Sequence, residues 1–260
     1  MCLILIAYRC HPRYEFVAAA NRDEFHARPT APLAEWNDAP GLWAGRDLQA
    51  GGTWLGLTRT GRFAAVTNYR DPGAFRPNAP SRGALASDFL SGREAARAYL
   101  GRVADRAALY NGFNLLMRDG AGLYYFSNRS GAAPLALEPG IHGLSNHLLN
   151  TPWPKVERGR AKLAAALEIN DGEPLVENLL SLLEDRWQPS GAELPNTGVG
   201  ANRERQLAPM FIATPEYGTR SSTVVLMAHD GATRIIEKTH SDGALREFRW
   251  DSANPGSAQG

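Results

Sequence analysis

MCLILIAY, residues 1–8, opens the chain with an apolar run whose second residue is a cysteine. The run predicts a buried β-strand, because it is short and aliphatic and ends at polar residues. A small second residue lets an aminopeptidase remove the initiator Met, which would leave Cys2 with a free α-amino group beside its thiol. Nucleophile and base would then share one residue. The alternative is that Cys2 is simply a small apolar residue at the start of a strand.

The next informative stretch is FVAAANRDEF, residues 16–25. Its apolar half, Phe16–Ala20, predicts a second strand, and the four polar residues Asn21–Glu24 come where that strand leaves the core. One interpretation is a turn with a surface ion pair, which contributes little. The other requires this strand to lie beside the N-terminal one, so that Asp23 could bond the Cys2 amine or order Arg22.

Further along the chain, strand-like and helix-like segments occur in blocks. Helices are expected over Ser81–Arg106, with an interruption near Gly92, over Trp153–Ile169 and over Pro174–Trp187. Blocks of strands and helices favour α+β layers over an alternating parallel sheet. The strands are expected at Leu3–Tyr8, Phe16–Ala20, Thr53–Thr58, Phe63–Asn68, Phe113–Arg118, Leu123–Ser127, Gly143–Asn146, Ser222–Met227, Thr233–Lys238 and Ala244–Trp250.

Two segments rich in turn-forming residues, His26–Leu48 and Pro189–Arg205, are expected to be loops. Asp230-Gly231 lies between two strand-like runs and predicts a hairpin turn. We expect a single domain over residues 1–250, followed by a disordered tail over 251–260.

Composition excludes several classes of function. The formal net charge is +1, from 28 basic and 27 acidic residues, so no nucleic-acid partner is expected. The two cysteines, Cys2 and Cys10, are too few for a disulfide framework and fit a reducing compartment. The N-terminal apolar run is too short to span a membrane, and no basic segment precedes it. We therefore expect a cytoplasmic protein without stable membrane insertion; no pattern assigns an oligomeric state.

A few polar residues outside the first two strands are candidates for chemistry. Asn68 and Asn146 each end a predicted strand, and they either make turns or aim amide donors at one point, as an oxyanion requires. Arg220 leads into a strand and either binds a carboxylate or phosphate or pairs with a surface acid. Core packing is the expected role of Trp54. The six histidines show no metal-ligand spacing, so no metal site is expected, and His11 is the weak alternative as a haem ligand.

Several motifs occur in a fixed order: Cys2, NRDE at residues 21–24, GGTWLG at 51–56, TNY at 67–69, YNGFNL at 110–115, GLSN at 143–146, TPWPK at 151–155 and YGTR at 217–220. On these motifs the chain closely resembles the NRDE family (transport and Golgi organisation protein 2-like), from Met1 to about Trp250. That family in turn is similar to the N-terminal-nucleophile hydrolases, especially the cysteine branch with penicillin V acylase and bile salt hydrolase.

The resemblance implies a fold and a set of roles. The fold would be a four-layer αββα sandwich of antiparallel sheets. Cys2 would be the nucleophile, Asp23 would hold its α-amine, and Asn68 and Asn146 would be oxyanion donors. Arg220 corresponds more loosely to a late arginine near the nucleophile.

The chain also departs from the acylases, which carry an arginine three residues before the Asp. Here that position is Ala20. Arg22 would share the face of Ala20 in an unbroken strand, but it lies two residues further along.

Two functions follow as hypotheses. Members of the NRDE family are tied to haem trafficking and to lipid or acyl-CoA handling, which implies a carrier of a small amphipathic ligand. No cofactor would be required, and haem would enter only as transported ligand. The alternative is a Cys2-dependent hydrolase of an amide or acyl thioester. The expected ligand-binding residues are Asn21, Arg22, Asp23, Glu24, Trp54 and Arg70, with apolar walls from Trp36, Trp43 and Phe63.

Overall fold

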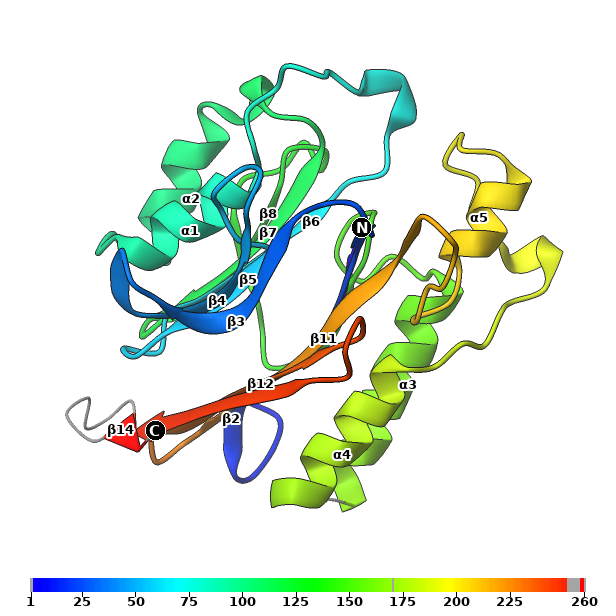
Figure 1. Ribbon diagram of the computed structural model, residues 1–260. Coiled ribbons are helices and arrows are strands. Elements are labelled where there is room, and N and C mark those ends of the chain that lie inside the picture. Colours follow the sequence, from blue (N-terminus) through cyan, green and yellow to red (C-terminus); the bar gives the residue numbers. More distant parts are fainter. Residues whose placement is uncertain (1, 170, 252–257, 260) are drawn as a thin grey trace.

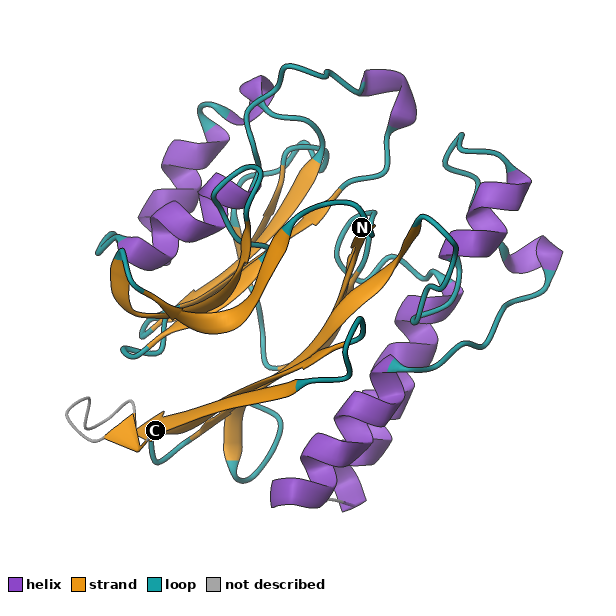
Figure 2. Cartoon of the chain, in the orientation of Figure 1, coloured by secondary structure: helices purple, strands orange, loops and turns teal. Residues whose placement is uncertain are grey.

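Two antiparallel sheets lie face to face, and a layer of helices covers the outer face of each (Figures 1 and 2). The computed structural model describes residues 2–169, 171–251 and 258–259. This arrangement is the four-layer αββα sandwich of antiparallel sheets that the sequence predicted, and that prediction is confirmed.

The first sheet holds both segments with which the sequence analysis began. β1 lies between β10 and β2, and β2 lies between β1 and β11, so the N-terminal strand is central in the sheet. In order, the strands are β10 (Gly140–Leu144), β1 (Cys2–Tyr8), β2 (Tyr14–Phe25), β11 (Tyr217–Ala228), β12 (Ala232–Thr239), β13 (Leu245–Asp251) and β14 (Ala258–Gln259).

The second sheet is a simple meander, in which every strand pairs with its neighbours in the sequence. Most of its connections are short, but the one between β6 and β7 contains both helices of this layer. Its strands are β3 (Thr30–Trp36), β4 (Ala39–Asp47), β5 (Leu55–Thr58), β6 (Phe63–Asn68), β7 (Phe113–Asp119), β8 (Gly122–Ser127) and β9 (Leu135–Ala136).

Each sheet has its own helix pair. α1 (Gly83–Ser91) and α2 (Ala96–Ala104) cover the second sheet, and α3 (Pro154–Ile169) and α4 (Gly172–Leu183) cover the first (Figure 1). Within the described residues, none of the helices combines the length and apolar character that crossing a bilayer requires. The remaining helical segments are α5 (Ala201–Leu207) and the 3₁₀ turns η1 (Pro72–Ala74), η2 (Ala107–Leu109) and η3 (Gly191–Glu193).

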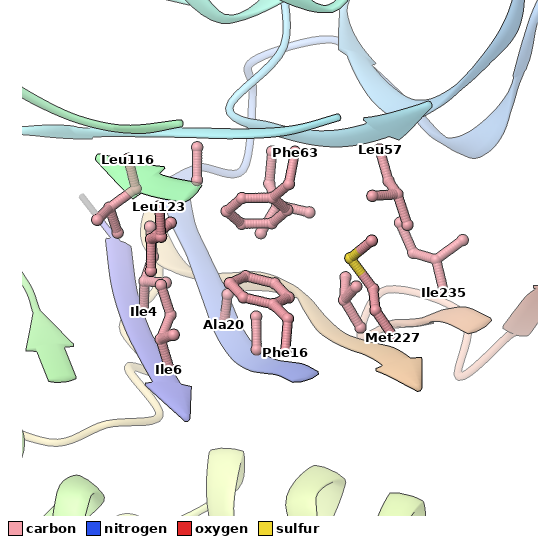
Figure 3. Close-up of a cluster of buried hydrophobic side chains, with 14 of the residues drawn as sticks. Ile4, Ile6, Phe16, Ala20, Leu57, Phe63, Leu116, Leu123, Met227 and Ile235 are labelled. Carbon is pink, nitrogen blue, oxygen red and sulfur yellow. The ribbon is translucent and has the colours of Figure 1, made fainter. Parts of the chain in front are cut away.

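The alternation of side chains along β1 explains why this strand is apolar on both faces. Ile4 and Ile6 point into the space between the sheets, where they join a cluster that includes Phe16 and Phe63 (Figure 3). Leu3 and its neighbours of the same parity pack against α3 and α4 instead. The Phe16 and Phe63 rings, one from each sheet, lie 4.9 Å apart. Complete burial of such a side chain contributes roughly 1.5–3 kcal/mol, so this cluster holds the sheets together.

The predicted loop His26–Leu48 is wrong, because this segment forms β3 and β4. β3 is the edge strand of its sheet, where a proline such as Pro32 is tolerated because one row of backbone groups needs no partner. The prolines were therefore a sign of an edge strand and not of irregular structure.

Other boundaries differ in informative ways. Asn21–Glu24 lies inside β2, so the turn interpretation of this segment is wrong. The break at Gly92 separates α1 from α2 as predicted. The second predicted loop contains η3 and the start of α5. Of the expected disordered tail, residues 252–257 and 260 lie outside the described residues.

Candidate functional site at the start of β1

Cys2 lies at the beginning of β1, between two polar residues of the neighbouring strands. The register of β1 and β2 places it directly opposite Arg22. On the other side Ile4 pairs with Leu144, and continuing that register by two residues brings Cys2 to Asn146. The hydroxyl of Ser145 donates to the Cys2 carbonyl at 3.2 Å, so the residues that follow β10 lie beside the start of β1. Residues directly opposite in a sheet share a face, so the three side chains face the second sheet.

Alternation along β2 separates the members of the NRDE motif. Arg22 shares the face of Ala20 and points between the sheets, whereas Asn21 points toward the helices. Asn21 Nδ2 donates to the carbonyls of Leu183 and Met210, at 2.7 and 2.9 Å. Its Oδ1 accepts from the Ser222 hydroxyl at 2.6 Å. These contacts use the amide fully, so Asn21 anchors the helix layer and does not line the space between the sheets.

Asp23 is buried on the same side of β2 as Asn21. Its Oδ1 accepts from the Thr219 hydroxyl at 2.7 Å, and its carbonyl accepts from the Tyr217 hydroxyl at 2.9 Å. Burial raises the pKa of the Asp23 carboxyl, while the N-terminal charge, Lys155, Thr219 and Arg22 act in the opposite direction. A carboxylate under the influence of the N-terminal charge fits the role implied for Asp23, to hold an α-amine.

Burial is the strongest influence on the acidity of the Cys2 thiol. The residue is 8% exposed, and burial raises the pKa of the thiol. The N-terminal charge, Arg22 and a hydrogen bond from the Asp23 backbone lower it, and the Asp23 carboxylate raises it further. A nucleophilic cysteine needs a lowered pKa or an adjacent base, so this thiol depends on a base for reactivity.

Asn146 and Asn68 meet where the two sheets are joined. The fully buried Asn146 donates from Nδ2 to the Asn68 carbonyl at 2.9 Å, and its own carbonyl accepts from the Arg70 backbone N–H at 2.8 Å. One N–H of the Asn146 amide is left over for another acceptor. Asn68 contributes its carbonyl, and by parity its side chain shares the face of Val66, toward α1. Its role as an oxyanion donor stays a prediction.

Arg22 and Trp54 form a pair that spans the sheets. The guanidinium lies 4.4 Å from the centre of the Trp54 ring, and burial lowers the pKa of Arg22. Trp54 fits here because the facing residue is Gly45, where an added Cβ would come within 2.0 Å of the indole. The sequence predicted core packing for Trp54 and also counted it among the expected ligand-binding residues; the structure adds the contact with Arg22.

The two remaining charged members of the predicted set lie at the margin of the site. Glu24 is half-buried, and its Oε1 accepts from the Phe25 backbone N–H at 2.9 Å. Arg220 lies at the register shift where β11 pairs with β2, and its Nη1 donates to the carbonyls of Phe25 and Arg28 at 2.8 and 3.1 Å. The structure therefore places Arg220 beside Arg22 and not opposite Cys2.

Arg70 lies on the opposite side of Asn146 from Cys2. Its Nη1 is 2.5 Å from Glu204 Oε2, both side chains are at most 5% exposed, and the guanidinium lies 5.0 Å from the Trp153 ring. The sequence analysis placed Arg70 and Arg22 in one ligand cleft. The structure assigns them to different cavities.

Two cavities thus flank the Cys2 site. The first, of about 620 Å³, is lined by Tyr69, Arg70, Arg129, His147 and Trp153 among others, and we call it the Arg70 cavity. The second, of about 240 Å³, is lined by Arg22, Trp54, Arg220 and residues of β3 and β12, and we call it the Arg22 cavity. Cys2 and Asn146 line neither cavity; Asn146 is joined to Arg70 by a backbone hydrogen bond, and Cys2 pairs with Arg22 in the sheet.

Lys155 is a site residue to which the sequence analysis gave no role, although it ends the TPWPK motif. It is 4% exposed and donates to the Leu207 carbonyl at 2.9 Å. Burial lowers the pKa of its ammonium to about 8, and Asp23 is the strongest influence in the opposite direction. Lysine is seldom fully buried unless paired, and the position of Lys155 at the apolar start of α3 was the available signal.

The other aromatic walls that the sequence suggested belong to the core. Trp36, Trp43 and Phe63 are all buried, and Trp43 stacks on Trp250 with the ring centres 4.5 Å apart. Among the residues that the structure describes, no three His, Cys, Asp or Glu side chains gather in a way that could hold a metal ion.

The chain is similar to one known family over most of its length. The model of the family described as "Transport and Golgi organisation 2" matches residues 1–242. A relative from Bos taurus, Transport and Golgi organization protein 2 homolog, is 36% identical and covers 97% of this chain and 100% of its own length. The Homo sapiens homolog is 34% identical, with 95% and 96% covered.

Among solved structures, the chain is similar to two hydrolases at low sequence identity. A Caenorhabditis elegans ortholog of N-acylethanolamine-hydrolyzing acid amidase has a TM-score of 0.45 at 11% identity, covering 86% of this chain and 92% of its own. A mutant conjugated bile acid hydrolase from Clostridium perfringens has a TM-score of 0.43 at 8% identity, covering 100% and 95%.

Proposed function

The chain belongs to the Transport and Golgi organisation 2 family, and from that membership and the geometry around Cys2 we propose that it is a cytoplasmic carrier of a small amphipathic acyl ligand. The ligand would lie in the Arg70 cavity with its acyl carbonyl toward Asn146 and Cys2. Of the two ligands considered from the sequence, an acyl-CoA or related lipid is the better candidate, ahead of haem.

The observation that carries this proposal is the Arg70 cavity beside the Cys2 site. Its volume of about 620 Å³ falls in the range of roughly 300–1,000 Å³ that small-molecule sites occupy. Tyr69 and Trp153 supply aromatic surface. The two lining arginines are ion-paired, Arg70 with Glu204 and Arg129 with Asp71, so an anionic head group would compete with these acids for them. This combination suits a ligand with an apolar chain and a charged end.

The histidine in this cavity argues against haem as the ligand. His147 Nε2 is hydrogen-bonded to the Tyr69 hydroxyl at 2.7 Å, and its Nδ1 to the Thr151 hydroxyl at 2.9 Å. An iron ligand needs a free ring nitrogen, so coordination would break one of these bonds. Haem would then have to be held by apolar contacts alone.

A second candidate function, Cys2-dependent hydrolysis, is favoured by the register that sets Cys2 between Arg22 and Asn146. After removal of Met1, the α-amine would take the thiol proton while the sulfur attacks the acyl carbonyl. The spare N–H of Asn146 would stabilise the oxyanion. Departure of the protonated amine or thiol leaves a Cys2 thioester, which water then hydrolyses. This function is ranked second because it also requires the removal of Met1.

One experiment separates the two functions. Purified wild type, Cys2→Ser and Cys10→Ser are compared after intact-mass measurement of the N-terminus. Cys10 is the matched control, because it is the exposed cysteine of the chain. Palmitoyl-CoA affinity is measured by tryptophan fluorescence, and turnover by thiol release from palmitoyl-CoA and amine release from N-palmitoylglycine.

The carrier predicts saturable palmitoyl-CoA binding of equal affinity in all three proteins, with no turnover. Turnover by wild type and Cys10→Ser that is lost in Cys2→Ser would establish the hydrolase instead. Failure of wild type to bind palmitoyl-CoA, with saturable binding of haemin, would overturn the acyl assignment.

A further inference from the structure

The Arg22 cavity is a separate compartment between the sheets, with a volume of about 240 Å³. β3 and Trp54 form its wall on the second sheet, and Arg22, Ser221 and Glu237 form its wall on the first. Its volume is below the roughly 300 Å³ at which pockets for a whole drug-sized molecule begin. The cavity can therefore take a small group of a ligand, but not an acyl chain with its head group.

Arg22 is the unusual element in this cavity. It is 5% exposed, its Nη1 has no hydrogen-bond partner, and no carboxylate within the described chain forms an ion pair with it. A buried charge without a partner costs several kcal/mol, and buried polar groups are nearly always hydrogen-bonded. Stacking on Trp54 leaves the N–H edge of the guanidinium available.

A second donor lies next to it. Ser221 pairs with Arg22 in the register of β11 and β2, and its buried hydroxyl lies beside the Glu237 carboxyl, whose pKa it lowers. The facing acid, Glu237, accepts from the Leu33 backbone N–H at 2.7 Å, and burial raises the pKa of its carboxyl. This wall therefore holds one donor without a partner, Arg22 Nη1, and next to it a hydroxyl that Ser221 shares with Glu237.

The charged side chains that line the cavity are positive on balance. Three arginines, Arg22, Arg220 and Arg246, line it against two acids, Glu237 and Asp242. A guanidinium whose face is covered by an aromatic ring presents a planar edge, which matches a carboxylate through two parallel hydrogen bonds. A tetrahedral phosphate matches this flat edge less well.

We infer that the Arg22 cavity is a subsite for a short carboxylate-bearing group, held by the Arg22 guanidinium and the Ser221 hydroxyl. This rests on the proposed function in one respect: the group would be part of the ligand whose acyl carbonyl lies at Cys2. The native ligand then carries a carboxylate on the side of the carbonyl away from the Arg70 cavity.

The test uses propionate as probe and propionamide as its neutral isostere, with inorganic phosphate as a third arm, all at constant ionic strength. Affinities come from the concentration dependence of the thermal unfolding midpoint. The variants are Arg22→Met and Ser221→Ala. Arg46→Met is the matched control, since Arg46 also stacks on a tryptophan, Trp36, at 4.1 Å but is paired with Asp38 at the surface.

We expect saturable binding of propionate by wild type and Arg46→Met, weaker binding of propionamide, and at least about tenfold loss of propionate affinity in Arg22→Met. Ser221→Ala should lose propionate affinity by a smaller factor. If Arg22→Met does not fold, the affinity of Ser221→Ala tests the subsite instead. Equal effects of propionate and propionamide, tighter binding of phosphate, or full affinity in the variants would overturn the subsite.

Because propionate has no acyl-thioester and does not need the thiol, its binding should persist in Cys2→Ser. Loss of palmitoyl-CoA binding alone would therefore refute the proposed carrier and leave the subsite standing. Loss of propionate binding alone would refute the subsite and leave the proposed carrier standing.

Discussion

Arg22 and Arg70 are both buried, lie on either side of Cys2 and stack on a tryptophan. They differ in whether an acid of the chain pairs with them. Arg70 forms an ion pair with the buried Glu204, whereas Arg22 Nη1 has no partner. Arg70 is therefore compensated within the chain, and removing its partner should be costly. Arg22 feels the nearby acids Glu24 and Asp47, but within the described residues none of them forms an ion pair with it, which is the condition expected of a group that awaits a ligand.

The largest effect should come from breaking the compensated pair. Glu204→Ala removes the partner of Arg70 and also the acceptor of the Thr197 N–H and hydroxyl, at 2.8 and 2.6 Å. We expect the free energy of unfolding in urea to fall by about 3–5 kcal/mol, because a buried charge is left unpaired. Glu94→Ala, which removes an exposed ion pair with Arg102, should change it little.

A double variant tests whether this loss comes from the unpaired charge of Arg70. Arg70→Met with Glu204→Leu removes both charges and should recover part of the loss, since a buried pair can often be replaced by apolar groups. No recovery would mean that Glu204 acts through Thr197 and not through Arg70.

The second-largest effect on stability should come from the buried ammonium of Lys155, which lies near Asp23. The pKa of Lys155 is about 8 in the folded chain, against an ordinary value of 10.5. Below pH 8 the folded and unfolded chains both carry the proton, so folding bears the full cost of burying the charge. Between pH 8 and 10.5 the folded chain releases the proton first, so stability should rise as the pH rises.

Urea unfolding of wild type and Lys155→Met at pH 7 and pH 10 measures this. The difference between the two proteins should shift in favour of wild type by about 1–3 kcal/mol at the higher pH. A pH-independent difference would show that Lys155 is not perturbed by burial.

A smaller effect is expected from moving the ring beneath Arg22. Gly45→Ala places a Cβ within 2.0 Å of the Trp54 indole, so the ring must shift, at a cost of about 1–3 kcal/mol. Propionate affinity should fall with it. Gly101→Ala is the control: it lies within α2 with open space around it, and it should be neutral or stabilising by up to about 1 kcal/mol. Unchanged propionate affinity in Gly45→Ala would separate Trp54 from the subsite.

The smallest effect on stability should come from Arg22 itself. Without ligand, Arg22→Met should unfold at the same urea concentration as wild type or a higher one, with a gain of at most about 2 kcal/mol. A loss as large as that of Glu204→Ala would make Arg22 a structural residue like Arg70, and the comparison between them would fail.

Much of the architecture followed from local patterns. The sequence predicted the apolar strand β1, the strand β2 and the hairpin turn at Asp230-Gly231. Gly231 adopts a positive φ of 96°, as such a turn requires. β3 and β4 were missed because their prolines resembled loop composition, and only the sheet order reveals that β3 is an edge.

The site was predictable only where it is local in sequence. Cys2 and Arg22 meet because their strands are joined by a short connection, and the pairing of these two strands was one of the two interpretations of the sequence. Arg70 and Glu204 are 134 residues apart, and no local pattern links them. Glu237 left a detectable signal, since an acid occupies the same face of β12 as the buried Ile235.

The most direct test of the account is a crystal structure of Cys2→Ala with palmitoyl-CoA. The account predicts the acyl carbonyl within hydrogen-bond distance of Asn146 Nδ2, beside position 2, with the rest of the ligand in the Arg70 cavity. A ligand bound elsewhere on the molecule, with Asn146 making no contact to it, would contradict the assignment of the Cys2 end of the sandwich as the binding site.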